Sequence, residues 1–329
     1  MPNITLTFDE SIAPDQRERV DGLFAAWSLP ILTGAIHVKP LAGGANNVNL
    51  KVTVSGRDFA LKLRDHLGVA ASNAKVQEAI QGQKLAHSLG VAPAVHAASP
   101  EGDFLSDFIV GKTLRPEIIR QEGHVPAMVA SLLKLHSAPL PQRRFRLDDD
   151  IRTFMTGAAA VDATTPDGFD DLLRLSYDLH DVIVGSAAPI SFIHADLVPQ
   201  NFMASDRGVM LVDFDYCGRG LTVIDIAGAT SQAEMTEAEA EVFMRLYDPA
   251  LDEAQRARVK CVQFINAIRE AAWSLMAEGT IGGSTTVFGD WSYAYHRDSN
   301  LELARGLLAS FDLAALRKKI CVVRPGARF

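Results

Sequence analysis

Two short polar stretches of the chain carry residues whose types and spacing could support phosphoryl transfer. The first, HADLVPQN, ends at Asn201, and the second, DFD, begins at Asp213. An asparagine and a neighbouring carboxylate offer the oxygen ligands that suit Mg²⁺, which takes its other ligands from water and phosphate. In the phosphoryl-transfer template, one Asp accepts or orients the attacking hydroxyl, while an Asn and a second Asp bind the metal. Those roles fall to Asp196, Asn201 and Asp213.

A hairpin is predicted to bring the two stretches together. NFMA and VMLV flank a good four-residue turn, SDRG, at residues 205–208. Antiparallel pairing places Asn201 opposite Val212 and leaves Asp213 one step further on, at the open end of the hairpin. Strict alternation would point Asn201 and Asp213 to opposite faces, so a shared ion requires the ladder to end or twist there. Asp196 would enter beside them from the preceding loop.

The same residues also have an ordinary structural interpretation. Asp and Asn are common loop residues that cap helices and close turns, so a histidine and an aspartate two positions apart carry little information. The full pattern, with Asn201 five residues beyond Asp196, then a hairpin and then DFD, is much harder to obtain by chance. For His194 a structural role, in which the ring hydrogen-bonds the backbone and fixes the loop, is at least as well favoured. Pro199 disfavours a helix in this loop.

Three strands near the N-terminus are predicted to carry a cation for nucleotide phosphates. IHVKPL, NLKVTV and FALKLR alternate as half-buried strands do, and they form an antiparallel sheet over about residues 34–64. In FALKLR, Lys62 lies on the face opposite the apolar residues. Ala60 shares the face of Lys62 and is small enough for a flat base to pack over it. This A-L-K resembles the A-I-K of the third strand of protein kinases.

An acid on the next helix would position that lysine. A helix is predicted over about residues 73–88, and Glu78 is the one acidic residue between positions 66 and 100. An exposed strand lysine and a solvated helix acid are the structural alternatives. Lys62 and Glu78 precede the aspartate motifs in the order that the template requires. Both structural alternatives are therefore less favoured.

The loop LAGGANN, between the first two of these strands, lies where a phosphate-covering loop would be. Gly43 and Gly44 permit close approach of the backbone to an anion, and Asn46 belongs to the same loop. Two glycines in a hairpin are more often simply a turn, and the stretch is not G-x-G-x-x-G. The loop is therefore a weaker candidate than the aspartate motifs.

The composition limits the classes of protein. The chain has 329 residues, 48% of them hydrophobic, which is enough for two lobes with separate cores. Its formal net charge of −8 predicts no global attraction to nucleic acid or to anionic membranes. The N-terminal stretch lacks the order of a secretory signal, and no apolar stretch spans a bilayer comfortably, so a cytoplasmic protein is expected. Three widely spaced cysteines indicate reduced thiols.

The order of the expected elements predicts an α+β protein. An extended piece, DFLSDFIVG, follows the early sheet, and helical periodicity dominates the rest of the chain. The division predicts a nucleotide-binding lobe at 1–107, a hinge at 108–112 and a catalytic and substrate lobe at 113–329. Helices are expected at these positions: 126–137, 168–184, 237–247, 252–278 and 291–310.

Several motifs together resemble the choline/ethanolamine kinase branch of the aminoglycoside-phosphotransferase-like kinases. FIHADLVPQNFM followed by LVDFDY is the most specific part, and the resemblance covers roughly residues 38–310. The other resembling stretches are LAGGANNVNLKV, FALKL, SDFIVGKTL, LLKLHSAP, VIDIAG and REAAWSLM.

The resemblance implies a bilobal protein-kinase-like fold, with a small antiparallel-sheet N-lobe and a larger, mainly helical C-lobe. It implies binding of Mg-ATP and phosphorylation of a small-molecule alcohol. By position, Asp196 is similar to the catalytic base, and Asn201 and Asp213 to the metal ligands. Asp215 would assist metal or substrate binding, and Asp225, in VIDIAG, would brace the catalytic loop.

The substrate is open at this level. A choline-type cation is held by aromatic faces and carboxylates, and Trp273, Trp291 and Glu270 are candidates for such a pocket. Trp273 resembles a tryptophan that lines the pocket of choline kinases, but core packing is about equally favoured. Aminoglycosides, thiamine or another small alcohol are alternative substrates. A catalytically silent nucleotide-binding protein is an alternative of another class, which the presence of Asp196 disfavours. The sequence does not predict an oligomeric state.

Overall fold

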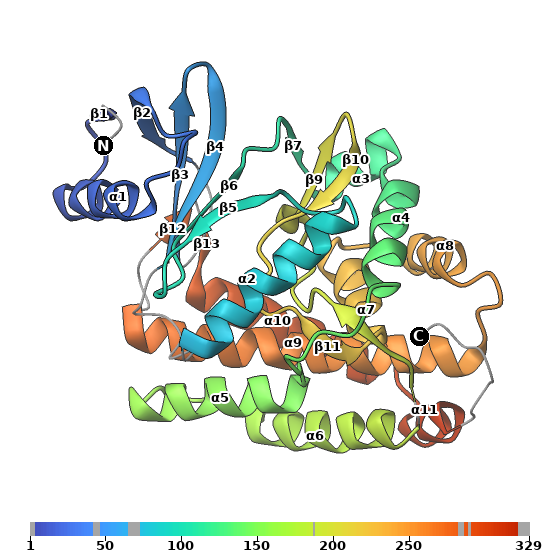
Figure 1. Cartoon of the computed structure of the whole chain (residues 1–329). Helices are drawn as coiled ribbons and strands as arrows, with labels where there is room; N and C mark the ends of the chain where they lie inside the picture. The colour runs from blue at the N-terminus through green and yellow to red at the C-terminus, as the bar shows by residue number, and fades with distance from the viewer. Residues whose placement is uncertain are drawn as a thin grey trace. The chain divides into compact units, whose positions relative to one another are not determined.

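The computed structural model describes residues 4–41, 47–64, 73–186, 188–281, 286–288 and 291–321. The chain divides into two compact units, Met1–Val110 and Gly111–Phe329 (Figure 1). Each unit is described by itself below.

The first unit is built on a six-stranded sheet with the order β1-β2-β3-β4-β6-β5. β2, β3 and β4 pair antiparallel, as predicted from their alternation. The turn between β3 and β4 has positive φ at Ser55 (49°) and Gly56 (78°), the geometry that joins two strands through two residues. β1 was not predicted, and it pairs parallel with β2. The strands are β1 (Ile4–Phe8), β2 (Gly34–Pro40), β3 (Asn47–Val54), β4 (Arg57–Arg64), β5 (Val95–Ala98) and β6 (Phe104–Asp107).

The two faces of this sheet have different coverings. Phe59 and Leu61 of β4 belong to a core cluster that includes Phe24 of α1 (Pro14–Trp27). On the other face, Phe104 of β6 packs with apolar side chains of α2 (Asn73–Ser88), the helix predicted over the same residues. Lys62 is the β4 partner of Phe104, so it lies on the α2 side of the sheet. The alternation of β4 therefore separates Lys62 from the main core.

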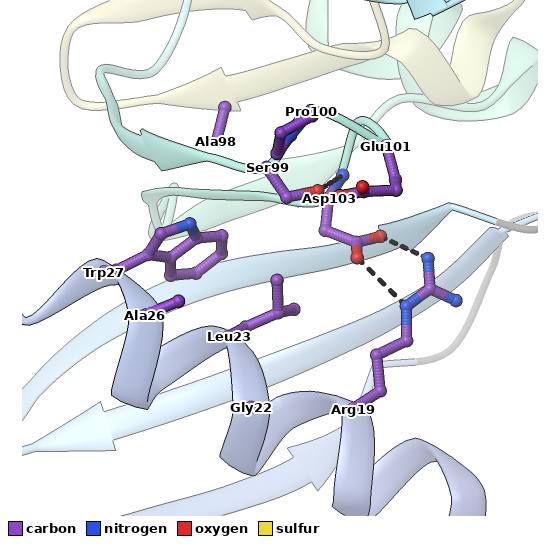
Figure 2. A pocket seen from close by; sticks show the side chains of 10 residues that line it. All are labelled: Arg19, Gly22, Leu23, Ala26, Trp27, Ala98, Ser99, Pro100, Glu101 and Asp103. Atoms are coloured by element: carbon purple, nitrogen blue, oxygen red, sulfur yellow. Dashed lines mark hydrogen bonds and ion pairs between the residues drawn. The ribbon is translucent and has the colours of Figure 1, made fainter.

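An arginine on α1 ties this unpredicted helix to the sheet. Arg19 donates to Asp103 from Nε (3.0 Å) and Nη2 (2.6 Å), as Figure 2 shows. Asp103 is 2% exposed and also accepts the backbone N–H of Arg64 at 2.8 Å. A cavity of about 430 Å³ lies between α1 and the β5–β6 turn beside this pair, with Trp27 in its wall (Figure 2). The paired geometry anchors α1 through a buried carboxylate whose hydrogen bonds come from two directions.

The second unit is mainly helical and is organised around one long helix. α9 (Glu253–Ile281), orange in Figure 1, contacts α5, α6, α7, α10 and α11. All five helices predicted from periodicity are present, with small shifts at their ends. The other helices of the unit are α3 (Pro116–Glu122), α4 (Val125–His136), α5 (Leu147–Ala160), α6 (Phe169–Gly185), α7 (Val223–Gln232), α8 (Glu237–Tyr247), α10 (Tyr293–Ala309) and α11 (Leu313–Ile320).

One predicted helix boundary was wrong. The helix expected from residue 291 begins at Tyr293, and Trp291 and Ser292 form the short strand β13, which pairs with β12 (Thr286–Phe288). Ser292 is the N-cap, because its hydroxyl accepts the backbone N–H of Tyr295 at 3.1 Å. Among the described helices, none is both long enough and apolar enough to cross a bilayer.

Short strands of the second unit carry the loops of interest. β9 (Phe202–Ser205) pairs antiparallel with β10 (Gly208–Leu211) and also with β7 (Gly111–Thr113). A Cβ on Gly111 would lie 2.2 Å from the backbone oxygen of Ala204, so only glycine allows this approach. β8 (Ile190–Ile193) pairs with β11 (Gly218–Leu221). The α+β class, with an antiparallel N-terminal sheet and a helical C-terminal part, is confirmed.

Candidate active site

A buried aspartate holds the loop that follows β8. Asp225, on α7 and 0% exposed, accepts the backbone N–H groups of His194 and Ala195 at 2.8 Å each. His194 is also fully buried, and its Nε2 lies 2.9 Å from the backbone oxygen of Val212. The imidazole thus joins the loop that carries Asp196 to the residue just before Asp213. These contacts make both side chains part of the scaffold of the loop.

A histidine that sequence reasoning had given no role supports the same carboxylate. His136, at the end of α4, places its Nε2 2.9 Å from Asp225 Oδ2. Its Nδ1 lies 2.6 Å from the hydroxyl of Tyr247 on α8. The stretch LLKLHSAP had suggested only family resemblance, because a histidine at a helix end has many ordinary explanations.

Asn201 fixes the backbone and side chain of the candidate catalytic aspartate together. Its Nδ2 donates to the backbone oxygen of Asp196 at 2.7 Å and to Asp196 Oδ2 at 3.1 Å. Asn201 is 8% exposed and ends a 3₁₀ turn at Pro199–Asn201. The expectation that Pro199 disfavours helical structure here was wrong for this short turn, since proline fits its first position, where no N–H is needed.

The β9–β10 hairpin ends just before Asp213, as an ion shared by Asn201 and Asp213 would require. Its ladder finishes at the pair Phe202–Leu211, and Val212 N then donates to the backbone oxygen of Asn201 at 3.0 Å, which confirms the predicted register. Asp213 follows with φ of 64°, outside the β region. The chain therefore leaves strand geometry at Asp213, so alternation no longer separates its side chain from that of Asn201.

The donor chemistry of this corner fits a hard cation. An amide oxygen of Asn201 and the carboxylate of Asp213, with Asp215 two residues further on, are the oxygen ligands that Mg²⁺ accepts. Within the described ranges, no three side chains of His, Cys, Asp and Glu are grouped to hold a metal by themselves. A cation here would depend on Asn201, water and substrate phosphate for the rest of its ligands, as Mg²⁺ commonly does.

A buried arginine that sequence reasoning missed lies beside Asp196. Arg269 of α9 is only 5% exposed, and its Nε lies 2.7 Å from Asp150 Oδ2. Its Nη1 lies 2.7 Å from Glu270 Oε1 and 3.9 Å from Asp196 Oδ1. The guanidinium carbon is 4.4 Å from the ring centroid of Tyr216, the residue after DFD. One cation thus contacts α5, α9, the loop that carries Asp196 and the residue that follows DFD.

Burial and neighbouring charges shift the acid-base behaviour of this cluster. Burial raises the pKa of Asp196 to about 8; Arg269 opposes the rise, while Glu270, Asp213 and Asp215 add to it. The pKa of Asp150 is raised for the same first reason, again opposed by Arg269. The pKa of Glu270 is lowered, because its bonds to Arg269 and His296 outweigh burial. A cation bound beside Asp196 would favour its carboxylate form.

The structure brings together only some of the residues predicted to bind the substrate. Glu270 has a side chain 14% exposed, and its Oε2 lies 3.3 Å from His296 Nε2. Trp273 is half-buried, with its ring 5.5 Å from that of Tyr293 and 5.8 Å from that of His296, both edge-on. Tyr293 is buried in the core, so Trp273 has one neighbour that packs as core. The side chain of Trp291 lies outside the described residues.

The nucleotide candidates belong to the first unit. Lys62 is 8% exposed, and its Nζ lies 5.9 Å from the ring centroid of Phe104. Glu78 lies on α2 with an exposed side chain. Gly43, Gly44 and Asn46 lie outside the described residues.

Comparisons with known proteins agree with these motifs. Residues 37–259 match the model of the phosphotransferase enzyme family. Protein LicA of Haemophilus influenzae is 21% identical over 210 residues, which cover 62% of this chain and 61% of LicA. A probable ethanolamine kinase of Arabidopsis thaliana is 24% identical over 193 residues, covering 54% of this chain and 51% of that protein. The matches thus span between half and two thirds of these relatives.

A solved structure shows the same fold over nearly the whole chain. The crystal structure of a choline/ethanolamine kinase family protein from Mesorhizobium loti aligns with a TM-score of 0.75 at 20% identity, covering 93% of this chain and 98% of that one. Because the family model matches more than half of its residues, the chain belongs to the phosphotransferase enzyme family. The predicted likeness to choline/ethanolamine kinases is confirmed.

Proposed function

We propose that the chain is an ATP- and Mg²⁺-dependent phosphotransferase that phosphorylates the hydroxyl of a small amino alcohol of the choline/ethanolamine type. The observation that carries the proposal is the double hydrogen bond from Asn201 to Asp196, at 2.7 and 3.1 Å, beside the hairpin end that delivers Asp213. The phosphoryl-transfer template uses these three residue types, with one Asp as the base and the Asn and the second Asp as metal ligands. A binding-only protein has no need of Asp196 in that position.

Asp196 is the base in this proposal. It orients the acceptor hydroxyl and accepts its proton as the acceptor oxygen forms a bond to the γ-phosphorus of ATP. The bond from that phosphorus to the β–γ bridging oxygen breaks, and ADP leaves with the electron pair. Asn201 holds the carboxylate at the required angle through Nδ2. Arg269 offsets part of the negative charge around Asp196.

Asn201 and Asp213 are the residues that would hold Mg²⁺, and Asp215 would assist them. When bound, the metal neutralises charge on the transferred phosphoryl group. In the first unit, Lys62 would bind nucleotide phosphates and Glu78 would orient it. The glycine loop, with Gly43, Gly44 and Asn46, would cover the phosphates. On this proposal residues 1–107 form the nucleotide-binding lobe, 108–112 the hinge and 113–329 the catalytic and substrate lobe.

The acceptor class rests on the relatives and on the acidic surroundings of Asp196. A probable ethanolamine kinase and a choline/ethanolamine kinase family structure are both similar to this chain. Glu270, Asp213 and Asp215 are acidic neighbours of Asp196, which suits a cationic acceptor. Trp273 and Glu270 would form part of the acceptor pocket.

The test is Mg²⁺-dependent release of ADP from ATP with a panel of choline, ethanolamine, thiamine and aminoglycosides. The proposal predicts release stimulated by an amino alcohol and abolished in Asp196→Asn. Stimulation by an aminoglycoside or thiamine alone would redirect the acceptor class. Binding of Mg-ATP with no stimulation by any alcohol would contradict the catalytic proposal.

A further inference from the structure

A series of hydrogen bonds runs from the end of α8 to the loop that carries Asp196. The hydroxyl of Tyr247 lies 2.6 Å from His136 Nδ1, and His136 Nε2 lies 2.9 Å from Asp225 Oδ2. Asp225 in turn accepts the backbone N–H of Ala195, the residue before Asp196, at 2.8 Å. Tyr247, His136 and Asp225 form the Tyr247 network. Sequence reasoning assigned no role to its first two members, which are 111 positions apart.

All three side chains of the Tyr247 network are buried. Tyr247 is 3% exposed, and the side chains of His136 and Asp225 are 4% and 0% exposed. At such a depth water does not readily replace a lost partner, and a buried polar atom without a partner is costly. Removal of one member should therefore displace the members that remain.

The chemistry of the three groups fixes the direction of each hydrogen bond. A carboxylate only accepts, so His136 Nε2 carries the hydrogen and donates it to Asp225. In a neutral imidazole the other ring nitrogen accepts, so Nδ1 accepts the hydrogen of the Tyr247 hydroxyl. The two rings also meet edge-on, with their centroids 5.5 Å apart. Tyr247 thus stabilises the tautomer and the ring orientation of His136 that donate to Asp225.

The Tyr247 network ends at a backbone conformation that needs support. Ala195 has a φ of 65°, in the left-handed region that is unfavourable for a residue with a Cβ. Such a conformation persists where the surrounding bonds over-determine it. Here Asp225 accepts the N–H groups of both His194 and Ala195. The position of the Asp225 carboxylate therefore sets the direction in which Asp196 leaves the backbone.

We propose that Tyr247 is a positioning residue for phosphoryl transfer, an inference that rests on the proposed phosphotransferase function. Through His136 and Asp225, its hydroxyl keeps the loop in the conformation that presents Asp196 to the acceptor. Without the hydroxyl, His136 Nδ1 loses its partner and the ring no longer holds Asp225 at one angle. Ala195 then relaxes toward ordinary backbone conformations, and Asp196 moves away from the acceptor.

The first arm of the test removes the hydroxyl alone. Tyr247→Phe keeps the ring and its packing, and kcat and KM are measured from ADP release with Mg-ATP and the best acceptor of the panel. We expect kcat to fall about tenfold with both KM values within about twofold of the wild type, since a small misplacement of a reacting group costs up to about 10²-fold. A tyrosine with only a packing role would change the melting temperature and leave kcat unaltered.

The second arm asks whether the effect passes through His136. His136→Leu should lower kcat at least as much as Tyr247→Phe does. The double variant should be no slower than His136→Leu alone, because substitutions within one hydrogen-bond network are not additive. Losses that multiply in the double variant would show that the two residues act independently, and would overturn the inference.

The third arm tests the strained residue. Glycine adopts a φ of 65° without steric strain, so it needs less support from Asp225 than alanine does. The fold loss in kcat caused by Tyr247→Phe should therefore be smaller in an Ala195→Gly background than in the wild-type background. An equal loss in both backgrounds would contradict a route through Ala195.

A matched control is available on α6. Tyr177 is half-buried, and the guanidinium carbon of Arg152 lies 4.2 Å from the centroid of its ring. Tyr177→Phe deletes the same group outside the Tyr247 network, so kcat should stay unchanged. An unchanged kcat in Tyr247→Phe, or a change in the acceptor KM alone, would overturn the inference while the phosphotransferase proposal stands. Absence of transfer by the wild type to any alcohol would contradict both.

Discussion

The loop that carries Asp196 and the ion cluster on α9 meet at this residue, but they are assembled in different ways. The loop is held mainly through backbone groups: Asp225 binds two N–H groups, and Asn201 binds a carbonyl oxygen of the loop. The cluster around Arg269 is held by side chains from α5, α9 and the loop. The first arrangement follows from spacing along the chain. The second exists only after distant helices have packed.

Because the two regions are held together differently, substitutions in the loop and in the Arg269 cluster should have different effects. Loss of the Asp196 carboxylate should reduce catalysis while the fold persists, because the bonds from Asp225 and Asn201 to the loop backbone remain. Loss of the central cation in the cluster should reduce stability, because it leaves buried carboxylates without a partner.

The largest expected effect is on activity. Asp196→Asn should lower kcat by about 10²–10⁴-fold, the range for loss of a general base, with little change in the affinity for Mg-ATP. Turnover with an amino alcohol and calorimetric binding of ATP check the two halves of this statement. Asp206→Asn, in the exposed 205–208 turn, is the matched control and should be neutral. Full activity of Asp196→Asn would show that Asp196 is not the catalytic base.

The next effect is on stability. Arg269→Met should lower the free energy of unfolding by about 3–5 kcal/mol, since it removes one partner from a buried ionic cluster. Chemical denaturation measures this change. Arg174→Met is the control, because Arg174 is 74% exposed and its pair with Asp171 is expected to contribute about 0–1 kcal/mol. If both variants lost the same small amount, Arg269 would not be the central cation of the cluster.

A smaller effect appears as pH dependence. Burial lowers the pKa of His180 below its usual 6.5, with Asp148 opposing the change, so the unfolded chain binds this proton more readily than the folded one. The associated stability is therefore complete above pH 6.5 and is lost as the pH falls through that value toward the folded pKa. The slope per group is at most about 1.4 kcal/mol per pH unit. His180→Gln should flatten the curve of unfolding free energy between pH 7.5 and 5.5; an unchanged slope would contradict this role.

The smallest expected effect is on stability, at the N-cap of α8. Thr236 caps α8 in a capping box, in which its hydroxyl accepts Glu239 N at 3.3 Å and Glu239 accepts Thr236 N at 2.7 Å. Thr236→Ala should cost about 1 kcal/mol of stability and leave kcat unchanged. Thermal unfolding and turnover measured on one preparation would test both parts. A loss of turnover without a loss of stability would contradict the expectation that this cap affects stability alone.

The sequence predicted the elements whose signal is local. The strands around Lys62 alternate with a period of two, and the hairpin before Asp213 has a clear four-residue turn. The register that places Val212 opposite Asn201 also followed from the turn length. Such features depend on neighbours a few residues apart, which a reader of the sequence can see.

The features that the sequence did not predict depend on packing between segments far apart in the chain. Nothing in REAAWSLM distinguishes Arg269, which pairs with Asp150 across 119 positions, from a surface arginine. His136 and Asp225 are 89 positions apart, and His136 and Tyr247 are 111 positions apart. α1 was missed although Arg19 anchors it to Asp103, and β1 although it pairs with β2, because both contacts join segments far apart in the chain. Spacing carries no information about such pairs until the helices are placed.

The most direct test of the central claim is ³¹P NMR of the full chain incubated with Mg-ATP and an equimolar mixture of ethanolamine and choline. The account predicts a new phosphomonoester resonance that grows in step with ADP and is absent with Asp196→Asn. ADP accompanied only by inorganic phosphate, or a phosphomonoester that persists in the variant, would contradict the assignment of Asp196, Asn201 and Asp213 as a phosphotransferase site.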